Sequence, residues 1–125
     1  MSDQRLTTVR SLLELFRAGD ADVLGSFADD ASYRVNAWNE GFVGLEAIAA
    51  EFERQHNLWS DLRIEILNIG SIGEVVFAER IDTVHMMGRD VHIHAVGVFE
   101  FGGAGKITSW REYFDMKEVE AQVSG

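Results

Sequence analysis

The sequence predicts an α+β fold in which helices near the N-terminus pack on one face of a cone-shaped, strongly curved mixed β-sheet. In the first half of the chain, apolar residues recur every three or four positions, the spacing of amphipathic helices. From residue 61 onward the pattern changes to alternation and to short apolar runs rich in β-branched and aromatic residues, which is typical of strands. Helices first and an antiparallel meander second indicate an α+β architecture. A sheet that bends around a helix layer leaves a conical pocket.

The chain has 125 residues and a mass of 14.0 kDa, the size of one domain spanning 1–125. The formal charge is −10 and Lys and Arg form no run, which disfavours nucleic acid or an anionic membrane as a partner. The absence of cysteine excludes a disulfide, a thiolate nucleophile and a cysteine-based zinc site. Because no apolar stretch approaches the roughly 18 residues of a membrane span, we expect a soluble cytoplasmic protein.

Three helices are expected in the first half of the chain. Residues 6–16 place their apolar side chains at spacings of three and four, and Gly19 ends this helix. A short second helix is expected within residues 20–31, with Asp20 or Asp22 as its N-cap. The third helix follows an intervening strand and loop, and it covers residues 45–56.

The strands are separated mainly by glycine, since the chain contains no proline. A first short strand is expected at 31–38 and a loop at 39–44. Four longer strands then follow as a meander, at 61–70, 74–87, 89–101 and 106–116. The last residues, 115–123, are expected to close the chain with a short helical turn.

Two of these strands carry charged residues among apolar ones. Arg80 and Asp82 lie two residues apart, so they share one strand face with Val84 and Met86. On the last strand, Glu112 lies between two aromatic residues of the same face, Trp110 and Phe114. Two neighbouring strands can therefore each direct a carboxylate into one apolar cavity, with the arginine between them. The alternative is a structural ion pair or an exposed strand face, which is the commoner explanation for any one of these residues.

The sequence resembles the limonene-1,2-epoxide hydrolase family, which belongs to the nuclear-transport-factor-2-like (NTF2-like), or SnoaL-like, superfamily. The resemblance covers roughly residues 6–120. It is carried by the stretches "FADDASY" (27–33), "ERIDT" (79–83), "GVFEF" (97–101) and "GKITSWREYFD" (105–115). It implies a homodimer that adds water directly to a small apolar epoxide and releases a vicinal diol, with neither a metal nor an organic cofactor.

The resemblance also implies roles for single residues. Arg80 matches an arginine that bridges two carboxylates, and Asp82 matches the general acid that protonates the epoxide oxygen. Tyr33 matches a tyrosine that holds the hydrolytic water. The substrate is expected to lie against four apolar side chains that share the strand faces of these groups, namely Trp110, Phe114, Val84 and Met86.

Two positions depart from the family pattern. Glu112 stands where the family has its second catalytic aspartate, which acts as the base, and it is one methylene longer. The family's asparagine, two residues after the tyrosine, is replaced by Val35, and Asn36 follows one position later. Asn36 faces away from Tyr33 in a regular strand, so it can serve as a catalytic residue only if a bulge inserts one residue there.

The chemistry fits these residue types. Opening an epoxide needs a proton donor on the oxygen and a base on the attacking water, so the two carboxyl groups must hold different protonation states. An apolar pocket disfavours two charged carboxylates, and an arginine between them favours one shared negative charge. Asp82 can then be neutral while Glu112 is ionised.

Other readings remain open. Two histidines at 92 and 94 share a strand face and His85 is near in sequence, but a third metal ligand is missing and hydrogen-bonded or exposed histidines are expected instead. An isomerase or cyclase of the ketosteroid isomerase or SnoaL type would use Asp82 or Glu112 to abstract a carbon-bound proton. A non-catalytic ligand-binding module would keep the pocket without the chemistry.

Overall fold

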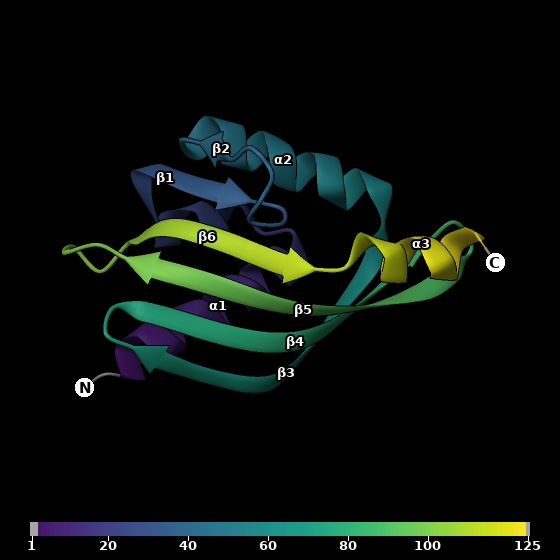
Figure 1. Cartoon of the computed structure of the whole chain (residues 1–125). Coiled ribbons are helices and arrows are strands. Elements are labelled where there is room, and N and C mark those ends of the chain that lie inside the picture. The colour runs from purple at the N-terminus through teal and green to yellow at the C-terminus, as the bar shows by residue number, and fades with distance from the viewer. Residues whose placement is uncertain (1–2, 125) are drawn as a thin grey trace.

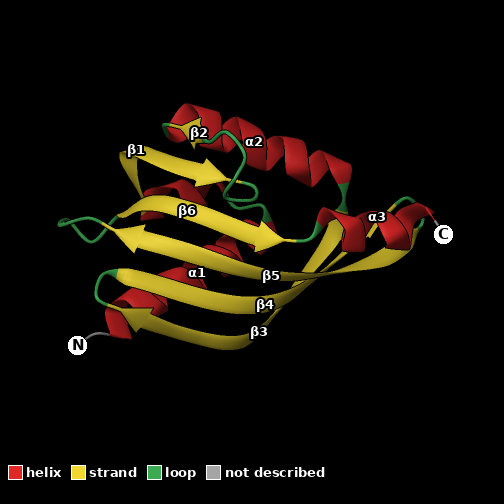
Figure 2. Cartoon of the chain, viewed as in Figure 1, coloured by secondary structure: helices red, strands yellow, loops and turns green. Residues whose placement is uncertain are grey.

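The computed structural model describes residues 3–124, which form one six-stranded sheet with helices packed against it (Figure 1). The elements follow along the chain as α1 (Asp3–Ala18), η1 (Ala21–Ser26), β1 (Phe27–Arg34), β2 (Phe42–Val43), α2 (Leu45–Leu58), β3 (Ser60–Ile72), β4 (Val75–Met86), β5 (Arg89–Phe101), β6 (Ile107–Phe114) and α3 (Met116–Ser124). Figure 2 shows the two long helices in the first half of the chain and the long strands after them, as the sequence pattern predicts.

The strand order in the sheet is β2-β1-β6-β5-β4-β3. Strands β3 to β6 pair antiparallel with their neighbours in the chain, which confirms the predicted meander. β1 runs parallel to β6 and pairs Tyr33 with Trp110, so the sheet is mixed. In the next pair, Gly97 of β5 lies opposite Glu112 of β6. A register shift between Ile66 and Asn68 in β3 interrupts the ladder, and such irregularities increase the local bend of a sheet.

The hydrophobic core lies between the helices and one face of the sheet. α1 packs on β3 and lies behind the sheet in Figure 1, and α2 packs on β1. The predicted inward faces are confirmed, because Leu12 of α1 and Ile48 of α2 are fully buried and Phe52 is nearly so. Trp110 of β6 is 2% exposed and lies at the centre of an aromatic cluster, in contact with rings of α1, α2, β1 and β5.

No helix within residues 3–124 is long and apolar enough to cross a membrane.

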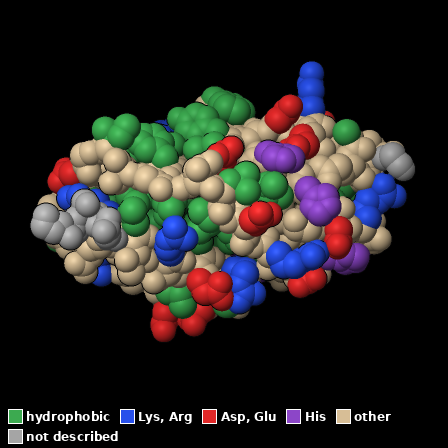
Figure 3. Space-filling view, turned by 90° about the horizontal axis from the view of Figure 1, so that it is seen from below, with side chains coloured by type: hydrophobic (Ala, Val, Ile, Leu, Met, Phe, Trp, Pro, Cys, Tyr) green, Lys and Arg blue, Asp and Glu red, His purple; other side chains and the backbone are tan. Residues whose placement is uncertain are grey.

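The opposite face of the sheet carries both apolar and charged side chains. Phe77 and Tyr113 are partly exposed there, and the ring of Trp38 lies 6.4 Å from that of Tyr113. Figure 3, a view from below, shows hydrophobic side chains gathered over one part of the surface and charged residues with histidines over another.

α3 covers the part of β5 that extends beyond the end of β6. Glu118 accepts hydrogen bonds from the backbone N–H of His94 at 3.1 Å and pairs with its Nδ1 at 2.5 Å. Gln122 bonds both the N–H and the carbonyl oxygen of His92, each at 2.7 Å. The helix therefore satisfies backbone groups that the free strand edge leaves unpaired.

The segment 20–38 differs from the prediction. Asp20 is an N-cap, accepting a hydrogen bond from the N–H of Asp22 at 2.9 Å, but the helix is only the 3-10 turn η1. β1 begins already at Phe27, because Phe27 pairs with Ile107 of β6 and this distant pairing overrides the local pattern. The predicted strand also ends early, at Arg34, and the expected loop 39–44 contains the short β2.

Candidate active site

A cavity of about 330 Å³ lies between the curved sheet, α2 and α3, within the range of small-molecule sites. Its walls are mainly apolar, and the few polar side chains come from β1, α2, β4 and β6. Met116 and Val119 of α3 close one side. Four of the predicted catalytic residues therefore line one mainly apolar cavity, namely Tyr33, Arg80, Asp82 and Glu112.

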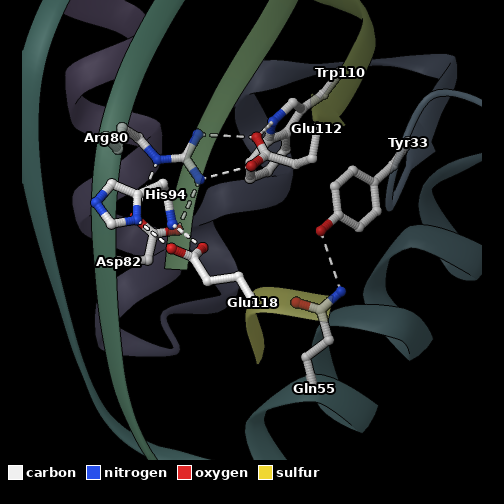
Figure 4. Close-up of polar contacts among 8 residues, drawn as sticks. All are labelled: Tyr33, Gln55, Arg80, Asp82, His94, Trp110, Glu112 and Glu118. Atoms are coloured by element: carbon white, nitrogen blue, oxygen red, sulfur yellow. Dashed lines mark hydrogen bonds and ion pairs between the residues drawn. The ribbon is translucent and has the colours of Figure 1, made fainter. Parts of the chain in front are cut away.

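Arg80 joins the two predicted carboxylates in this cavity (Figure 4). Its Nε and Nη2 donate to the two oxygens of Asp82 at 3.1 and 2.7 Å. Its Nη1 and Nη2 donate to the two oxygens of Glu112 at 2.9 and 2.6 Å. Two forked contacts thus converge on one guanidinium, a geometry that the planar arginine head favours and a lysine ammonium does not.

The two carboxylates differ in how deeply they are buried. The side chains of Arg80 and Glu112 are 3% and 8% exposed, whereas that of Asp82 is 16% exposed. Burial works to lower the pKa of Arg80, but the charge and hydrogen bonds of Glu112 and Asp82 together raise it well above its usual value. The arginine therefore stays charged between the two carboxyl groups.

Glu112 is held by a third donor. The indole Nε1 of Trp110 lies 2.5 Å from Glu112 Oε2, which also receives Arg80 Nη1. Among residues 3–124, Oε2 thus accepts two hydrogen bonds and Oε1 accepts one, which leaves Oε1 with a second acceptor position. Trp110 was expected as a substrate contact, and it lines the cavity, but it also fixes the direction of this carboxylate.

Gly97 makes room for this arrangement. A Cβ atom added at Gly97 would lie 2.6 Å from Glu112 Oε2 and 2.8 Å from Arg80 Nη1, closer than real Cβ atoms approach other atoms. Only glycine leaves space for the ion pair on this side of β5. Sequence reasoning missed this residue, although an isolated glycine inside a strand pattern is a signal of close approach.

Tyr33 faces the same cavity from β1. Its hydroxyl accepts a hydrogen bond from Nε2 of Gln55 at 3.1 Å (Figure 4). Burial, and then the negative charge of Glu112, raise the pKa of the tyrosine hydroxyl, so that it remains a neutral proton donor. Gln55 was not expected from the sequence, because it lies on α2 and no strand pattern relates it to Tyr33.

The remaining predicted site residues divide into two groups. Three apolar side chains line the cavity together with Trp110, namely Val84, Met86 and Phe114.

Asn36 does not reach the cavity. Its backbone adopts a left-handed conformation with φ of 70°, and its buried Oδ1 accepts a hydrogen bond from the N–H of Phe114 at 2.8 Å. The register of β1 against β6 shifts between Phe27 and Ser32, which lies before Tyr33. The pairing from Ser32 to Arg34 is regular, so β1 has no bulge after Tyr33 that would turn Asn36 inward. Val35 lines the cavity in its place.

Apart from the contacts of Arg80, no ion pair within residues 3–124 has both side chains largely buried. A hollow of about 430 Å³ between α1, η1 and α2 is lined by Asp20, Glu53 and His56. His85 pairs with Asp90, and His92 Nδ1 lies 2.9 Å from the hydroxyl of Thr83. Within residues 3–124, no three His, Cys, Asp or Glu side chains are grouped so as to hold a metal ion.

Comparison with known proteins identifies relatives of this fold. Residues 9–110 match the family model of the SnoaL-like domain. An LEH-like epoxide hydrolase from M. tuberculosis is similar at 26% sequence identity, with a TM-score of 0.81 over 96% of this chain and 89% of that one.

Two further solved structures share the fold at lower identity. One is a protein described as a SnoaL-like polyketide cyclase from Jannaschia sp. CCS1, with 18% identity and a TM-score of 0.87 over 98% of this chain and 92% of that one. The other is SalBIII, described as an epoxide hydrolase/cyclase-like enzyme in pyran ring formation in polyether salinomycin, with 21% identity and a TM-score of 0.82 over 94% and 95% of the two chains.

The space at Gly97 can be tested by Gly97→Ala. The added methyl group must displace Glu112, Arg80 or the ring of Phe99, so the free energy of unfolding in urea should fall by about 1–3 kcal/mol. Gly70→Ala is the matched control, because Gly70 lies in β3 and a Cβ there meets nothing within 4 Å. Equal stability of the two variants would show that the ion pair does not depend on this space.

The raised pKa of Tyr33 predicts a loss of stability at alkaline pH. In the unfolded chain a tyrosine releases its proton near pH 10, whereas folded Tyr33 holds its proton to higher pH. Its stabilising contribution is therefore complete below about pH 10 and is lost as the pH rises toward the folded pKa. Urea unfolding measured across this range should show a decline that Tyr33→Phe reduces. Tyr113→Phe, on the outer face, should leave the decline in place, and an equal effect of both replacements would contradict the prediction.

Proposed function

The chain belongs to the SnoaL-like domain family, and within that family we propose that it is a cofactor-independent epoxide hydrolase resembling the limonene-1,2-epoxide hydrolases. It would add water to a small, mostly apolar epoxide and release a vicinal diol. The observation that carries this proposal is the pair of carboxylates, Asp82 and Glu112, held by one buried arginine in an apolar cavity. The 26% identity to an LEH-like epoxide hydrolase supports it.

The hydrogen-bond pattern distinguishes the two carboxyl groups. Glu112 accepts three hydrogen bonds, from Arg80 and Trp110, whereas Asp82 accepts two, both from Arg80. The carboxylate with more donors is held more firmly in one direction, which supports Glu112 as the group that positions and activates the water. Asp82 is then the acid and Glu112 the base.

The reaction follows from this assignment. Glu112 removes a proton from a water molecule while the water oxygen forms a bond to one epoxide carbon. The carbon–oxygen bond on that carbon breaks, and its electron pair takes the proton of Asp82 to give the second hydroxyl group. The catalytic cycle closes when the proton gained by Glu112 returns to Asp82. Each proton transfer of this kind typically contributes about 10²–10⁴ in rate.

The direct test is a panel of terpene and styrene-type epoxides assayed for diol formation by the parent protein and by Asp82→Asn. The amide keeps the shape but is a far poorer proton donor, so turnover should fall by about 10²-fold or more while the protein stays folded. Asp90→Asn, an exposed carboxylate of the same sheet, should keep parental activity. No diol from any epoxide would refute the hydrolase proposal, and full activity of Asp82→Asn would remove Asp82 as the acid.

Replacements of Glu112 test whether the site is adapted to the longer side chain. Glu112→Gln should be nearly inactive, because an amide does not accept the proton of the water. Glu112→Asp withdraws the carboxylate from Arg80 and from the Trp110 indole, so the rate should fall roughly 10- to 100-fold. A faster Asp variant would instead indicate a decayed site whose ancestral geometry has been restored. Measuring kcat for the parent and both variants on one epoxide separates these outcomes.

A further inference from the structure

A network of side-chain hydrogen bonds connects α2 to Tyr33 at the cavity. Gln55 donates from Nε2 to the Tyr33 hydroxyl at 3.1 Å and to Oε2 of Glu51 at 2.9 Å. Glu51 is 4% exposed, and Arg54 binds it through two hydrogen bonds of 2.8 and 2.9 Å. Gln55 itself lines the cavity.

The neighbours of Gln55 determine which way its amide points. Burial works to raise the pKa of Glu51, but hydrogen bonds from Arg54 and Gln55 hold it below its usual value, so this group is a carboxylate near neutral pH. A carboxylate only accepts hydrogen bonds, and a flipped amide would place its oxygen against it. The NH₂ group therefore faces Glu51 and Tyr33. Figure 4 shows the nitrogen of the Gln55 amide toward Tyr33 and its oxygen on the other side of the amide.

This orientation leaves the Gln55 amide oxygen and the Tyr33 proton available for further hydrogen bonds. Both hydrogens of Gln55 Nε2 are used, and no group within residues 3–124 donates to its Oε1. The Tyr33 oxygen accepts from Gln55, and no group within the described range takes the Tyr33 proton. Oε1 of Glu112 accepts a single hydrogen bond from the described residues, and the charge of Glu112 raises the pKa of Tyr33.

A water molecule held by one donor and two acceptors uses both of its hydrogens and one lone pair, and these three groups are of those kinds. We infer that Gln55 Oε1 is a catalytic hydrogen-bond acceptor of the hydrolytic water, an inference that rests on the proposed function. The water accepts from Tyr33 and donates one hydrogen to Gln55 Oε1 and the other to Glu112 Oε1. One lone pair then remains on the water oxygen, directed by the other three contacts toward the epoxide carbon.

The inference also explains the apolar residue at position 35. The resemblance to limonene-1,2-epoxide hydrolases places an amide at this position, where the chain has Val35. Val35, Tyr33 and Gln55 all line one cavity, so an amide from α2 serves the space that an amide at position 35 would serve. In this chain, the amide that binds the water thus comes from α2 and not from the segment after β1.

The test combines a loss and a rescue. Gln55→Met keeps an unbranched side chain but removes the amide, and kcat for epoxide hydrolysis should fall about 10- to 100-fold with little change in KM, because the water is no longer directed. Adding Val35→Asn to this variant should restore at least about tenfold of the loss, and Val35→Asn alone is measured as the reference for the double variant. Thermal unfolding of all four proteins shows that they remain folded.

The outcomes distinguish the role of Gln55 from the epoxide hydrolase activity itself. A kcat of Gln55→Met within about twofold of the parent would overturn the role of Gln55 and leave the epoxide hydrolase proposal standing. A folded Gln55→Met variant that Val35→Asn does not rescue would also overturn it, since a merely structural loss is not repaired from another element. No diol from the parent protein would overturn the hydrolase proposal and this inference together. A high-resolution crystal structure gives a readout without turnover: an ordered water bonded to Tyr33, Glu112 and Gln55 Oε1 supports the role, and a water there that does not contact Gln55 refutes it.

Discussion

The burial of one guanidinium between two carboxylates is the interaction on which the rest of this structure depends. Removing either partner of a buried pair leaves an uncompensated charge, at a cost of about 3–5 kcal/mol. Arg80 avoids that cost through four hydrogen bonds to Asp82 and Glu112. The arrangement is accommodated only because Gly97, on the neighbouring strand, has no side chain. Folding and site formation are therefore governed by the same contacts in this part of the sheet.

The aromatic cluster connects these charges to the helix layer. Trp110 packs against Phe16 of α1 and Phe52 of α2 while its indole N–H donates to Glu112. A change in how either helix packs would thus move the donor that directs the carboxylate. The cavity is the space between sheet and helices that this cluster does not fill, and α3 closes one side of it. The position of the site follows from the curvature of the sheet.

The two halves of the site are built in different ways. The ion-pair half comes from the two neighbouring pairs β4–β5 and β5–β6, where alternation sets the directions of Arg80, Asp82 and Glu112. The other half joins β1 to α2, because Tyr33 meets Gln55 across 22 positions of sequence. Asn36, the nearest amide in sequence, is used instead to bond the end of β6. The amide that contacts Tyr33 is therefore set by proximity in space and not by proximity in sequence.

The sequence by itself determined the two long helices, the four-stranded meander and the common face of Arg80 and Asp82, because these follow from local periods of 3.6 and two residues. The same periodicity predicted the apolar walls at Val84 and Met86. Only the tertiary structure decided where β1 begins and ends, that Asn36 turns away, and that Gln55 and Gly97 adjoin the charged groups. Those features depend on contacts between segments far apart in the chain, and no local pattern records which distant side chain or empty space a residue will meet.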